Sequence, residues 1–169
     1  MLPTRQLAAA LVALALLPSM TTRAQTPAAP PPLIPYGLPI GLEVAKRVVA
    51  GAVAEAQKNG WKMAVAVVDP GGYLVYFERI NDTQLGSPDL AIEKARTAAL
   101  FRRPTKVFQD QLAAGGEGLR ILALRGVTPV EGGVPIVVDG KLIGAVGASG
   151  GTAAQDGQVA TAGAASLAK

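Results

Sequence analysis

An Asp139-Gly140 pair between two apolar runs is the feature that most restricts how this chain can fold. The runs are residues 134–138 and 141–148. A two-residue hairpin turn needs positive φ angles at both central residues, and Asp-Gly is one of the few pairs that adopts them readily. The sequence therefore predicts an antiparallel hairpin in the C-terminal part of the chain.

A second hairpin is predicted earlier in the chain. Residues 63–68 form a continuous apolar run, and residues 73–80 are rich in aromatic and β-branched side chains. The Asp-Pro-Gly-Gly sequence of residues 69–72 lies between them and is typical of a turn. The first run is apolar throughout, which indicates a central strand covered on both faces, and Met63 within it is expected to be a core residue.

The spacing of apolar residues identifies the other elements. Residues 119–124 fit either a strand or a helix, and we expect a strand there. Helices are expected at residues 40–58, 87–103, 106–112 and 155–168. The order α-β-β-α-α-β-β-β-α predicts an α+β fold with helices packed on a largely antiparallel sheet.

The beginning of the chain has the composition of a secretory signal peptide. The apolar run of residues 7–17 follows one arginine and precedes Thr22-Arg23-Ala24, a small-residue cleavage pattern. This run is shorter than the roughly 20 residues that span a bilayer, although a retained anchor is the alternative. We expect residues 1–24 to be a signal peptide and residues 25–37, rich in Pro and Ala, to be a linker. Residues 38–169 would then form one domain of an exported protein, periplasmic or extracellular, with no membrane span after cleavage.

Charge and missing residue types exclude several classes of function. The net charge of +4 includes two arginines of the predicted signal peptide. No basic stripe interleaved with aromatic residues indicates nucleic-acid binding. The chain contains no cysteine and no histidine. It therefore has no disulfides and no thiolate metal site, and it lacks the commonest metal ligand and general base. No catalytic residue is assigned.

The glycine-rich exit from the last predicted strand, residues 147–151, fits the G-x-S-x-G pattern of a hydrolase nucleophile at Ser149. A serine nucleophile needs an adjacent base, and the usual base is histidine, so a structural role is the better interpretation. Glycine in a strand often marks close approach of another backbone or of a ligand. The N–H groups of Gly150 and Gly151 could receive an anion. Asp156, in the first turn of the last helix, is expected to interact favourably with the helix dipole.

Several segments together resemble a known family. The run GGVPIVVDGKLIGAVGASGGTAAQD is similar to the C-terminal signature of the GlcG/HbpS-like family, and AVAVVDPGGYLVYFER, AIEKARTAALFRRPT and the first helix also match it. The resemblance covers about residues 38–169. It implies a profilin-like α/β/α fold with an antiparallel sheet of about five strands. It also implies homo-oligomers and, for some secreted members, haem binding coupled to a sensor protein.

The resemblance further implies candidate ligands for the iron of haem. In haem-binding relatives a threonine oxygen is implicated near the iron, and Thr97 and Thr105 are the matching candidates. Many members have histidine at the position of Tyr73. This departure means that any role of the histidine does not carry over to this chain. Tyr73 is expected to be a packing residue of its strand, with coordination of the iron as the alternative. The identity of the iron ligand stays open at this point.

Four basic residues are close together in the sequence: Arg96, Arg102, Arg103 and Lys106. They could hold carboxylates such as haem propionates, with a solvated surface as the alternative. We therefore interpret the protein as an exported homo-oligomer that binds a small anionic ligand, with haem as the best single candidate, for sensing or sequestration. The small residues of the last predicted helix also favour a homo-oligomer, with packing inside the fold as the alternative. An enzyme or enzyme accessory that acts on small organic acids is the alternative function.

Overall fold

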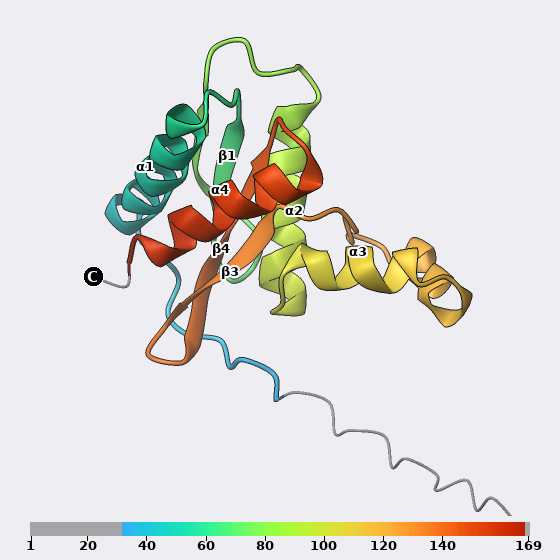
Figure 1. The fold of residues 1–169 in the computed structure, drawn as a ribbon. Helices are drawn as coiled ribbons and strands as arrows, with labels where there is room; N and C mark the ends of the chain where they lie inside the picture. The colour runs from blue at the N-terminus through green and yellow to red at the C-terminus, as the bar shows by residue number, and fades with distance from the viewer. Residues whose placement is uncertain (1–31, 168–169) are drawn as a thin grey trace, which may run out of the picture. The chain divides into compact units, whose positions relative to one another are not determined.

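The two predicted hairpins form one antiparallel sheet in the computed structural model, which describes residues 32–167. β1 (Ala64–Val68) and β2 (Leu74–Arg79) make the first hairpin, and β3 (Gly133–Val138) and β4 (Lys141–Ser149) make the second. β1 also pairs with β4, which gives the order β2-β1-β4-β3 (Figure 1). The predicted antiparallel sheet is confirmed, although it has four strands where about five were expected.

The Asp139-Gly140 turn has the geometry that its sequence predicts. Asp139 and Gly140 have φ angles of 50° and 72°, so both central residues adopt the left-handed conformation that a two-residue hairpin requires. Gly72, at the end of the first hairpin turn, has a φ of 82°. Each hairpin contains one shift of register near its turn, between Val67 and Val68 of β1 and between Ile136 and Val137 of β3.

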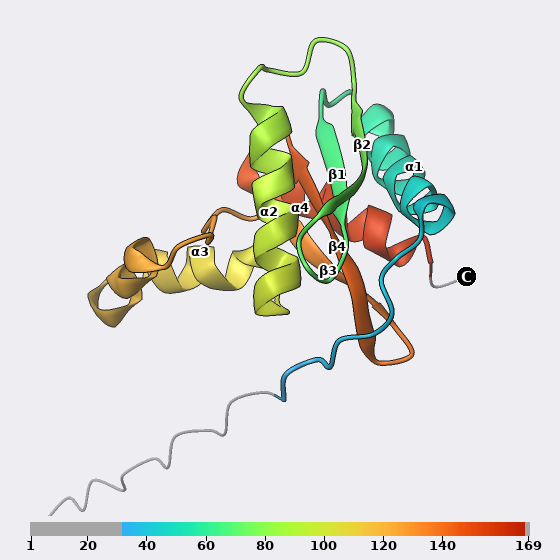
Figure 2. The same ribbon diagram turned by 180° about the vertical axis from the view of Figure 1, so that it is seen from behind.

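Helices cover both faces of the sheet. α1 (Leu42–Lys58) and α4 (Ala153–Ala165) pack against each other and against one face. α2 (Ser87–Phe101) packs against β1, β3 and β4 on the opposite face, as Figures 1 and 2 show from the two sides. The result is the α/β/α arrangement that the family resemblance implies.

The two faces of the sheet carry side chains of different size. Towards α1 and α4, β1 presents Val65 and Val67, and these residues belong to the largest core cluster. Towards α2, the same strand presents Ala64 and Ala66. A Cβ atom on Gly147 of β4 would overlap the backbone of α2 and lie 2.6 Å from its Ala95 nitrogen. The backbone of α2 therefore approaches the sheet closely, as expected for the strand glycines.

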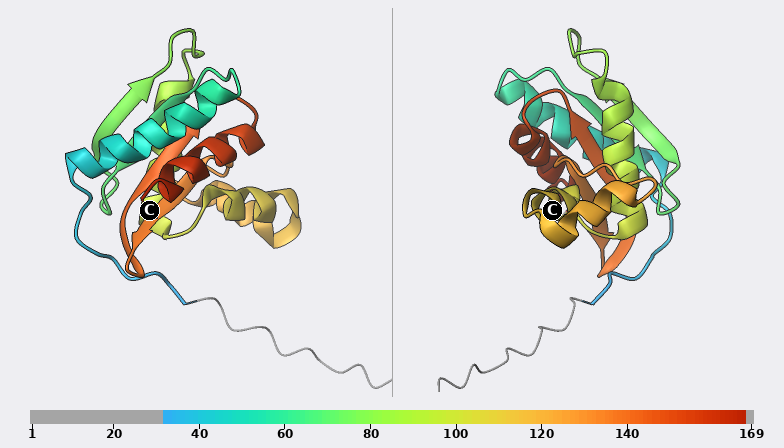
Figure 3. Two further views of the ribbon diagram at one scale, coloured as in Figure 1. Left: turned by 60° about the vertical axis from the view of Figure 1, so that its left-hand side comes forward. Right: turned by 90° about the vertical axis from the view of Figure 1, so that its right-hand side faces the viewer.

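An arm extends from the end of α2. It consists of α3 (Thr105–Ala113) and a 3₁₀-helix, η1 (Gly116–Ala123), and it projects away from the sheet (Figure 3). The prediction of a strand at residues 119–124 was therefore wrong. The apolar spacing of this segment also fits a helix, and the segment packs on α3 without a neighbouring strand to pair with. Leu119 and Leu122 of the arm are exposed, and so is Leu124 directly after it.

The residues before α1 form a strap that runs along the first half of β4. β1 pairs only with the second half of β4, from Ala145 onwards. At Leu142, the strap takes the place of a further strand: the N–H of Gly37 donates to the Leu142 carbonyl at 2.7 Å, and the N–H of Leu142 donates to the Pro35 carbonyl at 2.8 Å. The folded unit thus begins a few residues before Leu38, inside the segment predicted to be linker.

The predicted signal peptide and the first residues of the predicted linker, residues 1–31, lie outside the described residues. Between residues 32 and 167, no helix is long and apolar enough to cross a bilayer.

Candidate functional site

A buried ion pair joins the helical layers on the two sides of the sheet. Lys94 of α2 and Asp156 of α4 are both buried, and Nζ of Lys94 lies 2.6 Å from Oδ2 of Asp156. Nζ also donates a hydrogen bond to the Ala148 carbonyl at 3.3 Å. Gly132 lies against the pair, since a Cβ at this position would be 2.9 Å from Nζ. Asp156 is therefore the internal counter-ion of Lys94, beyond the helix-dipole role predicted for it.

The glycine-rich exit from β4 binds the same carboxylate. The N–H of Gly151 donates to Oδ1 of Asp156 at 3.0 Å. Burial raises the pKa of Asp156 above its ordinary value of 3.8, and hydrogen bonds from Lys94, Gly151 and Gly150 oppose this rise. The expectation that Gly150 and Gly151 receive an external anion needs correction, because Asp156 already occupies this position.

The two candidate threonines are buried and fix the loops around α2. Oγ1 of Thr97 donates to the Gly126 carbonyl at 3.2 Å and accepts the N–H of Thr128 at 2.9 Å. Oγ1 of Thr105 accepts the N–H of Gly133 at 2.9 Å. Both hydroxyl groups are used inside the fold, so the structure gives no support to either as an iron ligand.

Arg96 packs on Gly72, the residue that precedes Tyr73 at the end of the first hairpin turn. Nε of Arg96 donates to the Gly72 carbonyl at 3.1 Å, and a Cβ on Gly72 would be 2.9 Å from Cγ of Arg96 and 3.5 Å from Cγ of Leu100. Tyr73, the next residue, is 73% exposed. Its hydroxyl has no hydrogen-bond partner between residues 32 and 167.

The same surface continues along the end of α2. The hydroxyl of Tyr36 donates to the Leu100 carbonyl at 3.1 Å, and the guanidinium carbon of Arg102 lies 4.9 Å from the centre of the Tyr36 ring. We call the surface formed by Tyr73, Arg96, Leu100, Tyr36 and Arg102 the α2 shelf. Three of its five residues, Tyr73, Arg96 and Arg102, are predicted ligand-binding residues, and the other two are Tyr36 and the exposed Leu100.

Arg103 and Lys106 are not part of the α2 shelf. The guanidinium carbon of Arg103 lies 5.7 Å from the ring centre of Phe108, and its Nε donates to the Phe101 carbonyl at 3.2 Å. Lys106 forms an ion pair with Asp110 at 2.8 Å. The structure therefore divides the predicted basic cluster between two places.

Ser149 is buried, and its hydroxyl donates to the hydroxyl of Ser87 at 3.3 Å. Ser87 itself is the first residue of α2. The hydroxyl of Ser87 is not a base that could activate a serine nucleophile. This environment supports the structural interpretation of Ser149.

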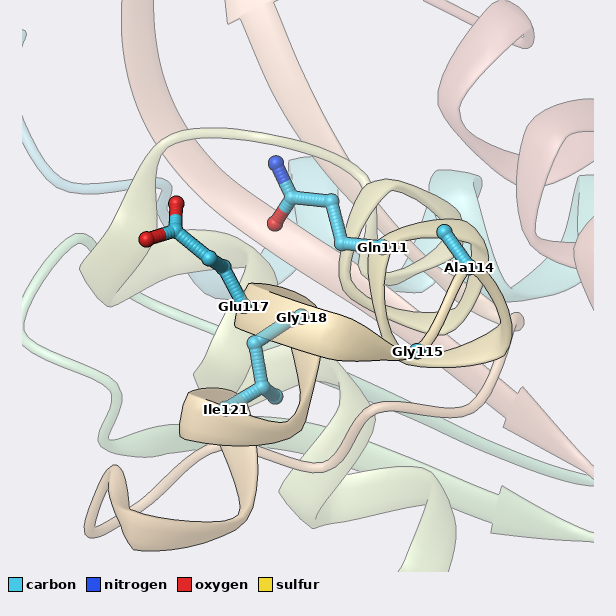
Figure 4. Close-up of a pocket in the computed structure, with 6 residues that line it drawn as sticks. All are labelled: Gln111, Ala114, Gly115, Glu117, Gly118 and Ile121. Carbon is cyan, nitrogen blue, oxygen red and sulfur yellow. The ribbon is translucent and has the colours of Figure 1, made fainter.

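A hollow in the arm between α3 and η1 has a volume of about 410 Å³. Gln111 and Glu117 extend their polar groups to the same side of it (Figure 4). Glu117 is paired with Arg120 at 3.3 Å, and the side chains that line the hollow include no cation. This hollow does not suit an anionic ligand. Among the described residues, no group of three or more Asp or Glu side chains could hold a metal ion.

A family comparison now identifies the fold. The family model described as "Haem degrading protein HbpS-like" matches residues 40–165 of the chain. This protein belongs to the HbpS-like family. The resemblance inferred from the sequence motifs is thereby confirmed.

Sequence relatives of this HbpS-like chain differ in length and in name. Protein GlcG of Escherichia coli K12 is 47% identical over 102 residues, which is 60% of this chain and 75% of GlcG. The corrinoid adenosyltransferase PduO of Salmonella typhimurium is 33% identical over 116 residues, 68% of this chain but only 34% of that enzyme.

Solved structures of similar fold include one with bound haem. The crystal structure of HbpS superposes with a TM-score of 0.71 at 30% identity, covering 78% of this chain and 92% of HbpS. The crystal structure of a PduOC:haem complex superposes with a TM-score of 0.68 at 29% identity, covering 76% of this chain and 95% of PduOC.

In this HbpS-like chain, sequence reasoning missed Lys94 as a buried residue. The signal is present in α2: Lys94 lies three residues after Ala91 and immediately before Ala95, and both alanines are buried against the sheet. A lysine on the apolar face of a helix predicts a buried ion pair. The partner could not be predicted, because Asp156 is on a helix of the opposite layer.

Proposed function

We propose that this protein binds haem on the α2 shelf, with the phenolate of Tyr73 as the iron ligand. The observation that supports this proposal is the position of Tyr73: an exposed phenol that directly follows Gly72, the residue on which Arg96 packs. The chain has no histidine or cysteine, and tyrosinate is an established ligand of ferric haem. Membership of the HbpS-like family and the haem complex of the PduOC structure favour the same ligand.

The residues of the α2 shelf fit such a group. Leu100 is 42% exposed and offers an apolar surface for the porphyrin. Arg96 and Arg102 would hold the propionates, because guanidinium groups bind carboxylates through paired hydrogen bonds. Met63 is fully buried in the core and cannot reach a surface ligand, so the thioether is not a competing iron ligand.

The surface of a single chain leaves the haem open to solvent. Ferric iron with one phenolate ligand is expected to be high-spin and to exchange readily. This behaviour suits sensing or transient sequestration better than electron transfer. We further propose that the protein is exported, on the basis of the leader sequence, and that a sensor protein is its partner.

We also propose a homo-oligomer, and the arm supports it better than α4 does. The small residues of α4 pack inside the fold: a Cβ on Gly163 would lie 2.9 Å from the Val48 carbonyl and 3.0 Å from Cβ of Ala52. The exposed leucines of η1 are available for contact with another chain.

A haemin titration of the full set of tyrosine variants tests the haem proposal. The chain contains three tyrosines, Tyr36, Tyr73 and Tyr76. Tyr73→Phe is expected to weaken haemin binding by about tenfold or more, the usual effect of losing a charge-assisted contact, and to change the visible spectrum. Tyr36→Phe and Tyr76→Phe should keep the wild-type spectrum. No saturable spectral change in the wild type would refute haem binding.

Arginine variants give the matched control. Arg96→Gln should weaken haemin binding several-fold, because it removes a propionate partner from the α2 shelf. Arg103→Gln removes an arginine that stacks on Phe108, away from the shelf, and should leave the affinity unchanged. Equal effects of the two substitutions would mean that the shelf is not the site.

A further inference from the structure

A second and smaller cavity lies where α3, β3 and α4 meet, and it has a different chemistry. Its volume is about 230 Å³, and it is lined by Lys106, Glu131, Thr161 and Val134 together with Pro104 and three glycines. Pockets for drug-sized ligands have volumes of roughly 300–1,000 Å³. This cavity therefore suits a molecule of amino-acid size and excludes a porphyrin.

Two opposite charges line the cavity without pairing with each other. The pKa of Lys106 is raised above its ordinary value, first by the hydrogen bond to Asp110 and also by the negative charge of Glu131. Glu131 is thus close enough for an electrostatic interaction, yet no ion pair joins it to Lys106 among the described residues. The exposed pair of Lys106 with Asp110 is of a kind that contributes little to stability, so Lys106 can turn to a ligand.

The polar groups of the cavity are held in place by the fold. The backbone N–H of Glu131 donates to Oε1 of Gln109 at 2.8 Å, which fixes the loop before β3. The hydroxyl of Thr161 donates to the Gly157 carbonyl at 2.7 Å, so its lone pairs remain able to accept. A Cβ on Gly157 would lie 2.7 Å from Cγ of Glu131, which shows that Glu131 packs directly on α4.

One wall of the cavity consists of glycine backbone, and the buried ion pair lies behind this wall. Gly132 lines the cavity on one side, and on the other side it lies against the buried Lys94–Asp156 pair. A side chain at Gly132 would point into that pair: its Cβ would be 2.9 Å from Cβ of Asp156. The ion pair therefore fixes the wall of the cavity but does not reach its interior.

From this arrangement we propose that the cavity binds a small zwitterion, such as an aliphatic amino acid. The carboxylate of Glu131 and the hydroxyl of Thr161 would accept from the ammonium group, and Lys106 would donate to the carboxylate. Pro104 and Val134 would contact a short aliphatic side chain. This inference is independent of haem binding, because it uses other residues.

Calorimetric titration with L-valine, isobutyrate and isobutylamine tests the proposal. L-valine carries both charges, and each of the other probes carries one of them on a similar aliphatic body. We expect saturable binding of L-valine and at least tenfold weaker binding of either singly charged probe, because each lacks one charge-assisted contact. Equal binding of isobutyrate, or the absence of saturable binding of L-valine at millimolar concentration, would overturn the proposal.

Two variants separate binding from folding. Gly157→Ala places a methyl group against the side chain of Glu131, so L-valine affinity should fall by about tenfold. The same change replaces glycine inside helix α4, so the melting temperature should not fall. Glu131→Gln should reduce the affinity similarly. The control Glu43→Gln alters a charged residue of the exposed pair with Lys46 on α1 and should leave the affinity for L-valine unchanged. Unchanged affinity in both Gly157→Ala and Glu131→Gln would contradict the proposal.

Discussion

The two faces of the sheet are packed by different means. On the face of α1 and α4, valines, Met63 and Ile136 interlock with helix side chains. On the face of α2, alanines and glycines let the helix backbone itself approach the strands. The pairing of β1 with β4 places the large and the small residues on separate faces. Val67 pairs with Val146 on the face of α1 and α4, and its neighbour Ala66 pairs with Gly147 on the face of α2. Substitutions that remove side-chain volume should therefore destabilise the face of α1 and α4, and substitutions that add side-chain volume should destabilise the face of α2.

The close packing of α2 on the sheet also determines the position of the α2 shelf. α2 carries Arg96 and Leu100 of the α2 shelf and, on its buried side, Lys94. Because the helix is held against the sheet by backbone contact, its exposed side chains are in a fixed position relative to the first hairpin and Tyr73. Rigid placement of this kind is what a ligand-binding surface requires.

The largest effect is expected from Gly147→Ser on the close face. The new Cβ would overlap the carbonyl oxygen of Ala91 and lie 2.6 Å from the nitrogen of Ala95, and backbone atoms cannot move aside easily. We expect a loss of at least about 3 kcal/mol in the free energy of unfolding, measured by chemical denaturation. Gly41→Ser, at the open N-cap of α1, should be neutral or stabilising. A near-neutral Gly147→Ser would refute the close approach of α2.

The next largest effect is expected where Lys94 connects the two layers. Lys94→Met leaves the carboxylate of Asp156 buried without its partner, which typically costs about 3–5 kcal/mol in unfolding free energy. The double variant Lys94→Met with Asp156→Leu removes both charges and should recover part of this loss. Strict additivity of the two single changes in denaturant titrations would show that the pair is not coupled.

Adjacent residues of β1 provide the most direct comparison of the faces. Val67→Ala removes volume from the large-residue face and should reduce the free energy of unfolding by about 1–3 kcal/mol through a cavity. Ala66→Val adds volume against α2 and should reduce it by at least as much through overpacking. A stabilising Ala66→Val, seen as a higher denaturation midpoint, would mean that the α2 face has unfilled space.

The smallest effect is expected in the pH dependence of stability. Burial raises the pKa of Asp156 in the folded protein above its ordinary value of 3.8, so the folded state holds this proton more tightly than the unfolded state. The corresponding contribution to stability is present at low pH and is lost as pH rises through the raised pKa. Relative to Asp156→Asn, the wild type should therefore lose stability as pH increases above about 4. A relative gain over this range would show that Lys94 lowers the pKa instead.

Local sequence signals predicted most of the fold, since both hairpins and the helices have strong turn or periodicity patterns. The strand expected at residues 119–124 failed because an apolar spacing of six residues fits either structure, and only packing on α3 decides it. The strand glycines correctly indicated close approach, but the sequence could not show that helix backbone, and not a ligand, fills the space at Gly147.

The candidate site was predicted less completely. Arg96 contacts Gly72 and Arg102 contacts the ring of Tyr36, whereas Thr97 and Thr105 are used in internal hydrogen bonds. Whether a side chain can reach a ligand depends on which side of its helix or strand faces the interior. Contacts between distant segments, such as Lys94 with Asp156, have no local signature that would reveal the partner.

The coordination of iron by Tyr73 is the central claim, and spectroscopy of the ferric haem complex tests it most directly. Resonance Raman and electron paramagnetic resonance spectra of the wild type should show a high-spin ferric haem with vibrations of a bound phenolate. These vibrations should disappear in Tyr73→Phe and persist in Tyr36→Phe and Tyr76→Phe. A low-spin six-coordinate iron, or phenolate vibrations that survive in Tyr73→Phe, would contradict the account.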